Sequence, residues 1–267
     1  ASDVYKRQDY GWHDTEDGIL AGYTFTEQTD TWAQDTYAAT NALQQGAQWE
    51  SQRTSANGVL SFDGADDYVM LDDTVIRSKD LQISLAALWK GGTAKQNLFW
   101  FGDETAYMAF TPCNENGVAE LTITDGQTTE HLTASAPLVK GEWSKITIRI
   151  IDGKGTLLIN GSQAASSSLS LTPLAVMSAA QDDYAFLGKG MTDRNFKGAV
   201  DYMNFYFKEV EEPQLTYSGS EAVDNTDPGV SGIRGDVNAD GQFSIADLVM
   251  MQKYLIRGGT LTDWQQG

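Results

Sequence analysis

Features that would assign this chain to several common functional classes are scarce in it or missing. The 267 residues include a single cysteine, Cys113, so no disulfide can form within the chain. No apolar stretch approaches the roughly 18 residues that a membrane-spanning helix requires, so we expect no membrane insertion. Lysine and arginine total 18 against 37 aspartate and glutamate residues, a formal net charge of −19. This excess of negative charge argues against nucleic acids and anionic membranes as partners.

Alternation of apolar and polar residues with a period of two dominates the chain from about residue 18 to residue 207. Such alternation is typical of strands, and it is clearest in segments 23–25, 59–62, 68–71, 81–89, 98–101, 121–124, 143–150, 155–160 and 200–207. Asp125-Gly126, Asp152-Gly153 and Asn160-Gly161 indicate tight turns, because these residue types tolerate positive φ. No helical periodicity of useful length occurs here. The pattern predicts an all-β sandwich in which the polar segment 41–57 is a long early loop.

Six segments of this region follow one another in the order of a known family. They are 60–71 (LSFDGADDYVML), 81–90 (LQISLAALWK), 98–103 (LFWFGD), 141–148 (GEWSKITI), 155–161 (GTLLING) and 196–206 (FKGAVDYMNFY). Together they resemble the laminin-G-like, concanavalin-type jelly-roll family found beside glycoside hydrolases. The resemblance implies a jelly-roll sandwich over residues 16–208, with Trp89 and Trp143 at core positions. Such domains usually bind ligands or act as accessory modules, and their ligands vary widely.

The residues give little support for a catalytic site in the sandwich. Glycosidases need two carboxyl groups at a defined separation, and concanavalin-type enzymes can place them on one strand as E-x-D-x-x-E. This sequence contains no such run. Asp66-Asp67 and Asp72-Asp73 are adjacent pairs at expected strand ends, where neighbouring side chains point to opposite faces. The two histidines lie near no serine or cysteine motif, so we expect no enzyme activity from the sandwich.

One aromatic side chain is a candidate for stacking on a sugar. Trp100 stands between Phe99 and Phe101, and the family pattern places apolar core residues at the two Phe positions. Trp100 is therefore expected to face away from the core, where it is either an exposed platform for a sugar ring or covered by a loop. Tyr107 and Tyr184, near expected loops, are weaker candidates.

The C-terminal part of the chain has the spacing of a calcium-binding loop. Residues 236–247 read DVNADGQFSIAD, which matches D-x-[DN]-x-[DN]-G-x5-E with Asp in place of the final Glu. Gly241 stands where such a loop turns sharply. Calcium takes about six to eight oxygen ligands, and the residues placed to supply them are Asp236, Asn238, Asp240, Gln242 through its backbone carbonyl, and Asp247. We expect a Ca²⁺ site here; the alternative is an acidic surface turn.

The calcium loop continues into a run with Leu248, Met251 and Leu255 on one face, which predicts one helix. Segments 235–241 and 246–255 resemble the first repeat of a type I dockerin, a calcium-dependent module that binds cohesins on cellulosome scaffolding proteins. The resemblance implies that residues 234–267 are a truncated dockerin, because no second D-x-N-x-D-G run occurs. The positions that touch cohesin in this family correspond to Ile245, Ala246, Gln252, Lys253 and Arg257. Many dockerins carry Ser or Thr at the first two of these positions, so a more apolar specificity is expected here.

The remaining segments flank or connect the two modules. Residues 209–233 are acidic and poor in apolar residues, which predicts an extended linker. Residues 1–15 show no signal-peptide pattern, and we expect them to be disordered or foreign to the native protein. The single dockerin repeat predicts that the chain is a fragment. The laminin-G-like resemblance also raises a structural calcium in the sandwich, with Asp201 as the candidate ligand.

These observations predict a non-catalytic fragment of a secreted, cellulosome-type multimodular protein. The sandwich would be an accessory domain that binds plant cell-wall polysaccharide, and the dockerin would tether it to a cohesin outside the cell. The parent would be a plant-polysaccharide glycoside hydrolase with its catalytic module upstream. One alternative is a structural or adhesive protein whose sandwich binds protein or acts as a spacer. Another is that the sandwich is itself an enzyme.

Overall fold

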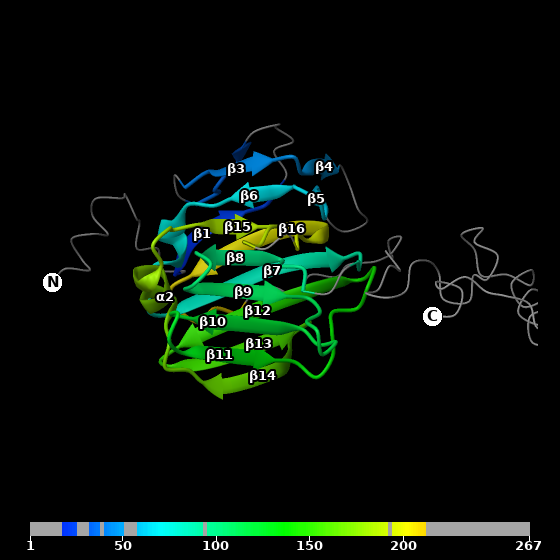
Figure 1. Ribbon diagram of the computed structural model, residues 1–267. Coiled ribbons are helices and arrows are strands. Elements are labelled where there is room, and N and C mark those ends of the chain that lie inside the picture. The colour runs from blue at the N-terminus through cyan, green and yellow to red at the C-terminus, as the bar shows by residue number, and fades with distance from the viewer. Residues whose placement is uncertain are drawn as a thin grey trace, which may run out of the picture.

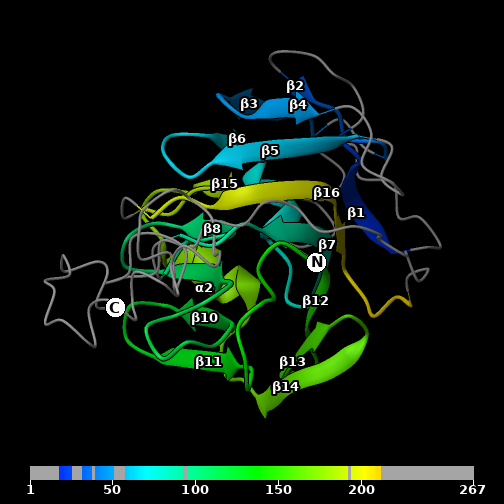
Figure 2. The ribbon, with the colours of Figure 1, turned by 90° about the vertical axis from the view of Figure 1, so that its right-hand side faces the viewer.

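Two antiparallel β-sheets packed face to face form the part of the chain that the computed structural model describes, namely residues 18–25, 32–37, 40–50, 58–92, 95–191 and 194–211. The predicted all-β sandwich is therefore confirmed. Figure 1 looks onto one sheet, which we call the front sheet, and the other, the back sheet, lies behind it. Figure 2 shows the two layers from the side.

The front sheet contains eight strands. Their order across the sheet is β11 (Thr129–Thr133), β10 (Glu120–Thr124), β9 (Tyr107–Thr111), β8 (Phe99–Gly102), β15 (Ala185–Leu187), β6 (Tyr68–Met70), β3 (Ala42–Gln45) and β2 (Trp32–Ala33). Four consecutive strands, β8 to β11, pair with their neighbours in chain order. β15, which lies far along the chain, pairs with β8 on its other side. Contacts between distant segments therefore join β8 to the rest of the sheet.

The back sheet also contains eight strands. Its order is β14 (Ser162–Ser168), β13 (Lys154–Ile159), β12 (Trp143–Ile151), β7 (Leu81–Trp89), β16 (Lys197–Tyr206), β5 (Val59–Asp63) and β4 (Gln48–Glu50), with β1 (Ile19–Tyr23) paired to β16. All nine residues of β7 are buried, which explains why the alternation in segment 81–89 gives way to four consecutive apolar residues at 86–89. The central strands of this sheet are thus the best protected from water.

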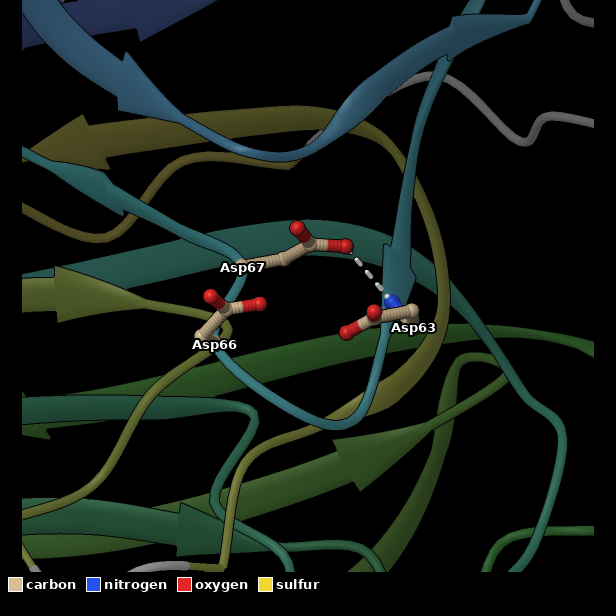
Figure 3. Close-up of side chains that lie close together, drawn as sticks. All are labelled: Asp63, Asp66 and Asp67. Atoms are coloured by element: carbon tan, nitrogen blue, oxygen red, sulfur yellow. Dashed lines mark hydrogen bonds between the residues drawn. The ribbon is translucent and has the colours of Figure 1, made fainter.

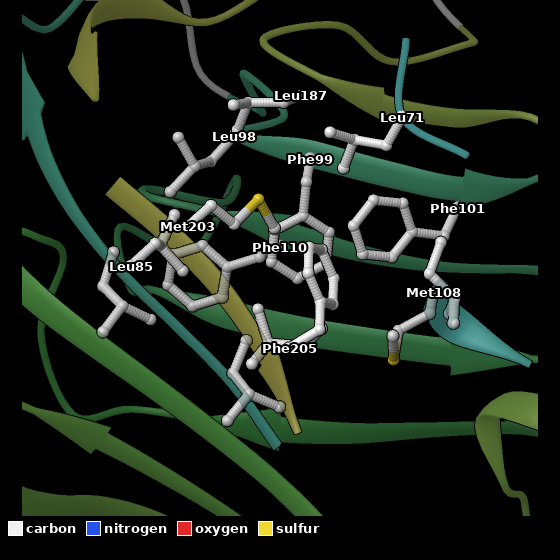
Figure 4. Close-up of a cluster of buried hydrophobic side chains, with 14 of the residues drawn as sticks. Leu71, Leu85, Leu98, Phe99, Phe101, Met108, Phe110, Leu187, Met203 and Phe205 are labelled. Carbon is white, nitrogen blue, oxygen red and sulfur yellow. The ribbon is translucent and has the colours of Figure 1, made fainter. Parts of the chain in front are cut away.

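Aromatic rings from both sheets meet in one core. Phe99 and Phe101 of β8 stack with ring centroids 4.6 Å apart, and Phe110 of β9 lies 6.1 Å from Phe99. From the back sheet, Phe205 comes within 6.1 Å of Phe101. Figure 4 shows these rings with the leucine and methionine side chains that fill the space around them. All four rings are fully buried, so the apolar area removed from water drives the packing of one sheet on the other.

Two short helical segments occur where the sequence showed no helical periodicity. η1 (Asp73–Ile76) is a 3-10 turn, and α2 (Pro173–Ala179) is an α-helix of 7 residues. Thr172 caps α2, because its hydroxyl accepts a hydrogen bond from the Ala175 N–H at 3.1 Å, and Pro173 occupies the first turn. Two turns are too few for a helical repeat to be visible in a sequence. α2 packs at one end of the sandwich against β8, β9 and β10 (Figure 1).

The expectation of a long loop over residues 41–57 is wrong for its first part. β3 and β4 lie there, joined through Gly46, which adopts a φ of +81°. β3 pairs with β6 in the front sheet and β4 with β5 in the back sheet, so this connection crosses from one sheet to the other. β3 and β4 lie near or at the sheet edges, where glutamine side chains can face solvent. This explains why the segment looked like a loop. Residues 51–57 lie outside the described residues.

The two tryptophans expected in the core differ. Trp89 is buried there as predicted, and its Nε1 donates to Gln96 Oε1 at 2.9 Å. Trp143 is half-buried on the outer side of the back sheet, where it packs against Val59 and Ala199, so its assignment to the core is wrong. The isoleucines of β12 that face the core have even numbers. An odd-numbered residue of that strand therefore faces outward.

The predicted linker begins with residues that bind the back sheet. Val210 N–H donates to Gln82 Oε1 at 3.0 Å, and Gln82 Nε2 donates to the Val210 carbonyl at 2.9 Å. Arg149 forms an ion pair of 2.6 Å with Glu209. Residues 212–233, like residues 1–15 and 234–267, lie outside the described residues. Within the described part of the chain, no helix has the length and apolar character needed to cross a membrane.

Candidate functional site

The outer surface of the front sheet, which we call the front face, carries a row of side chains across six strands. Because alternate residues of a strand point to opposite sides, β8 buries Phe99 and Phe101 and turns Trp100 outward. The strand register aligns one outward residue from each of β6, β15, β8, β9, β10 and β11; in that order they are Met70, Phe186, Trp100, Ala109, Thr122 and His131. The row changes from apolar to polar halfway across the sheet.

Trp100 faces away from the core, as predicted, but it is not an exposed platform. Only 7% of its surface is accessible. The ring of Tyr107 stacks on it with centroids 3.9 Å apart and planes 24° apart, and Trp100 Nε1 donates to the Asp103 carbonyl at 3.1 Å. Of the two alternatives from the sequence, exposure is wrong and cover is right, but the cover is a ring from the neighbouring strand rather than a loop. The surface that a ligand would meet is the half-buried Tyr107.

Small residues opposite each ring make this stack possible. Trp100 lies across from Ala109, and Tyr107 lies across from Gly102. The two rings are thus diagonal neighbours on adjacent strands, each beside a position with almost no side chain, and long side chains can meet across such a diagonal. Gly102 also has a φ of +113°, where a Cβ would come within 2.1 Å of the Ala106 carbonyl. Glycine at this position therefore permits the backbone conformation of the turn and leaves room for the Tyr107 ring.

A second group of rings lies beside the first, on β15, β6 and the residue before β15. Tyr184 stacks on Phe186 with centroids 5.2 Å apart, and Tyr68 meets Phe186 edge-on at 5.4 Å. Lys189 Nζ lies 4.6 Å from the centre of the Tyr68 ring. Tyr184 is 36% exposed and Met70 is 39% exposed, so this part of the front face is open to solvent.

Tyr184 and Tyr107 were the weaker candidates from the sequence, and both lie on the front face beside Trp100 or Phe186. Sequence reasoning did not single out Tyr68 or Phe186. The alternation that placed Trp100 outward could have found both residues, because Tyr68 and Phe186 each stand next to a residue that faces the core.

The other half of the front face is polar. Thr122 Oγ1 lies 3.2 Å from His131 Nδ1, and Thr133 Oγ1 donates to Glu120 Oε2 at 2.8 Å. His131 and Glu120 approach to 3.5 Å. Burial raises the pKa of Tyr107, and the negative charge of Glu120 raises it further. The phenol therefore stays protonated at neutral pH and can donate a hydrogen bond beside this polar group.

Asp103 holds the turn that supports the aromatic half. Its Oδ1 accepts from the N–H groups of Thr105 and Ala106, both at 2.7 Å, and its Oδ2 accepts from Gln181 N–H at 2.7 Å. Burial would raise the pKa of this carboxyl, but the backbone donors outweigh burial and hold the pKa below its ordinary value. One ionised side chain thus ties the β8–β9 turn to the segment that leads into Tyr184.

Comparison with known proteins identifies the fold family. The family model for the concanavalin A-like lectin/glucanases superfamily matches residues 63–216, more than half of the chain. The chain belongs to this superfamily. Among curated proteins, the comparison found no match by sequence.

Solved structures share the superfamily fold at low sequence identity. Domain 4 of AbnA, an extracellular GH43 arabinanase from Geobacillus stearothermophilus, was solved with arabinotriose. It is similar over 74% of this chain and 94% of that one, with a TM-score of 0.60 and 18% identity. Trypanosoma rangeli sialidase is similar over 77% of this chain but only 33% of the sialidase, with a TM-score of 0.53 and 10% identity. The chain thus spans about a third of the sialidase. At these identities the likeness shows the fold alone.

A separate hollow in the sandwich lies beside the segment 136–140. Its volume is about 560 Å³, and its lining includes Trp89, Cys113, Leu138 and Val139. The lining is mostly apolar, and its tryptophan is buried, so it offers no exposed ring for stacking. The front face combines exposed rings with polar groups and is therefore the stronger candidate site.

The adjacent acidic pairs do not behave as the sequence suggested. Asp72 accepts from Thr74 N–H at 2.9 Å and caps η1, while Asp73 forms an ion pair of 2.6 Å with Arg77. Asp66 and Asp67 lie in a bend before β6 rather than in a strand, so strand alternation does not apply to them. Together with Asp63 they each offer one carboxylate oxygen that lies within 4.8 Å of the other two, and no other group of three or more His, Cys, Asp or Glu ligands occurs among the described residues.

Asp201, the candidate ligand for a structural calcium, lies at a β-bulge in β16, where the pairing with β7 shifts between Val200 and Tyr202. It is not part of the acidic group. The predicted calcium ligands Asp236, Asn238, Asp240, Gln242 and Asp247 lie outside the described residues. So do the predicted cohesin contacts Ile245, Ala246, Gln252, Lys253 and Arg257. These assignments stay predictions from the sequence.

Proposed function

We propose that the sandwich is a non-catalytic carbohydrate-binding module whose binding surface is the front face. The observation that carries this proposal is the pair of accessible tyrosine rings, Tyr107 and Tyr184, each stacked on a second aromatic ring. A flat apolar ring can pack against the C–H face of a sugar, and by analogy with pairs of aromatic side chains each such contact would contribute about 1 kcal/mol. The hydroxyl, imidazole and carboxylate groups of β10 and β11 lie on the same face and would supply hydrogen bonds for orientation.

Rigidity favours this function. Tyr107 cannot change its side-chain position without losing its contact with Trp100. Asp103 fixes the turn between β8 and β9, the strands that carry the two rings, through backbone hydrogen bonds. A surface that is already in its binding conformation loses little conformational entropy when a ligand binds. The sugar would therefore meet rings whose positions are set by the sheet.

The structural neighbour supports an oligosaccharide as the ligand class. Domain 4 of the arabinanase shares the fold over nearly its whole length and was solved with arabinotriose. We infer a plant cell-wall polysaccharide as the ligand, with arabino-oligosaccharides as the first probes and xylan and β-glucan fragments as the next.

A comparison of two tyrosine variants tests the site. The full chain is titrated with the oligosaccharides by calorimetry, alongside Tyr107→Ala and Tyr37→Ala. Tyr37 is 54% exposed and lies near Gly22 of β1 in the back sheet, so it is a matched control. Tyr107→Ala should weaken binding about tenfold, equivalent to about 1.4 kcal/mol, while Tyr37→Ala binds as the parent does. Equal affinities for all three proteins would reject the front face. No binding to any probe would favour the structural or adhesive alternative.

We also propose that residues 234–267 act as a calcium-dependent dockerin that tethers the sandwich to a cohesin, in a secreted, cellulosome-type protein. The support is the spacing of the oxygen-bearing residues in 236–247. Asp240→Ala should lower the calcium affinity of the full chain and abolish capture by a cohesin. Ile245→Asp should weaken capture while leaving calcium binding intact. Capture that persists without calcium, or in both variants, would contradict the assignment.

A further inference from the structure

The loop between β5 and β6 gathers three carboxylates. Asp63 ends β5, and Asp66 and Asp67 precede β6; Figure 3 shows their carboxylates close together, with one Asp67 oxygen turned toward the Asp63 N–H. Their ligand oxygens all lie within 4.8 Å of one another. The loop is held in this shape by two backbone donors: Asp63 N–H donates to Asp67 Oδ2 at 2.8 Å, and Ala65 N–H donates to Asp63 Oδ1 at 2.7 Å.

Lys197 lies opposite Asp63 in the pairing of β5 with β16. Among the described residues, however, no lysine, arginine or histidine forms an ion pair with any of the three carboxylates. Asp67 is itself buried. The loop thus holds three carboxyl groups close together, one of them on a buried residue.

A second observation, from a distant part of the chain, points to a ligand here. Asn195, which precedes β16, is only 8% exposed. Its Nδ2 donates to the carbonyl of Ala65, so its carboxamide points into the loop. Its Oδ1 is buried and accepts no hydrogen bond. Buried polar oxygens nearly always have a partner, and an unpaired oxygen on a side chain that binds this loop is suited to a cation.

We propose that the β5–β6 loop binds a calcium ion, with oxygens of Asp63, Asp66, Asp67 and Asn195 as ligands. Every donor is a hard oxygen, which suits calcium or magnesium and not the metals that prefer nitrogen or sulfur. Two oxygens bound to one calcium at about 2.3–2.6 Å lie at most about 5 Å apart, and the three carboxylates fall within that limit. Calcium also accepts the irregular geometry of a mixed carboxylate and amide site more readily than magnesium.

The ion would join segments that are far apart in the sequence. It would tie the β5–β6 loop, which ends directly before Tyr68, to Asn195, which precedes β16. The site is distinct from the predicted calcium loop at 236–247 and does not depend on carbohydrate binding by the front face.

The test uses the full chain with the C-terminal loop disabled by Asp236→Asn and Asp240→Asn. On this background, calorimetry should show one calcium bound per chain, and calcium should raise the melting temperature. Adding Asp63→Asn or Asp66→Asn should each weaken binding about tenfold or more, because a charged ligand is lost. Asparagine keeps the acceptor oxygen, and Asp66 is exposed, so both variants should fold.

Asp182→Asn is the matched control, since it removes one exposed negative charge outside the loop. It should bind calcium as the background protein does. The proposal is overturned if the background protein binds no calcium, or if Asp63→Asn and Asp66→Asn bind it no more weakly than Asp182→Asn.

Discussion

The two sides of strand β8 carry aromatic rings with nearly the same burial and different neighbours. Inside, Phe101 is fully buried and lies 6.1 Å from Phe205 of the opposite sheet. Outside, Trp100 is 7% exposed, but its ring partner Tyr107 belongs to the adjacent strand of the same sheet. The inner ring therefore joins two sheets, whereas the outer rings pack on one sheet and meet solvent. Burial alone therefore does not separate a ring that joins the two sheets from a ring on the outer surface; the neighbours of the ring do.

The difference between the inner and the outer rings of β8 should have its largest effect on the free energy of unfolding. Phe101→Ala would leave a cavity between two sheets that cannot close around it, and we expect a loss of about 3–5 kcal/mol in the free energy of unfolding. Denaturant unfolding of the sandwich measures this value. A loss no larger than that of Tyr107→Ala would show that the inner and outer rings are equivalent, against the comparison.

The turn that permits the outer stack should be the next most sensitive position. Gly102→Ala forces a Cβ onto a residue with a φ of +113° and within 2.1 Å of the Ala106 carbonyl. We expect a destabilisation of about 3 kcal/mol, because backbone strain and a steric clash act together. Near-ultraviolet circular dichroism should also change, since the Trp100–Tyr107 stack is disturbed. An unchanged spectrum and stability would contradict the role given to this glycine.

Asp103 should have a smaller effect that depends on pH. Its pKa is lowered in the folded protein, so its contribution to stability is present above about pH 4, the ordinary value for aspartate. That contribution is lost as the pH falls through the lowered pKa. Asp103→Asn should cost about 1–2 kcal/mol at neutral pH and less at pH 3. Melting curves of both proteins from pH 7 to pH 3 check this, and a constant difference between them would contradict it.

The smallest change in stability is expected for the exposed ring. Tyr184 is 36% exposed, so Tyr184→Ala should alter the free energy of unfolding by less than about 1 kcal/mol. It should nevertheless weaken binding of the best oligosaccharide probe, as Tyr107→Ala does. A variant that unfolds readily, or that binds as the parent does, would place Tyr184 outside the binding surface.

The sequence predicted the sheets better than it predicted the surface. Alternation around Trp100 correctly showed which way this side chain points, because the period of a strand is independent of its neighbours. It did not show that Tyr107 covers the ring, since that depends on which strand lies alongside and in what register. The small residues Gly102 and Ala109 were visible in the sequence, but their meaning required the pairing of β8 with β9.

The other errors have the same origin. Asp66 and Asp67 looked like strand residues, and a bend gathered them with Asp63. Trp143 looked like core from the family pattern, and its position in β12 turned it outward. Asn195 carries no recognisable motif, because its oxygen is placed by a contact across 130 positions of the chain.

Mapping the bound surface tests the central claim most directly. Hydrogen–deuterium exchange of the full chain is measured with and without a saturating oligosaccharide. The front-face assignment predicts slower exchange in the turn at 103–106 and in segment 182–189, with no change in β13 and β14 of the back sheet. Protection confined instead to 112–118 and 134–140, around the apolar hollow, or to the back sheet would contradict it.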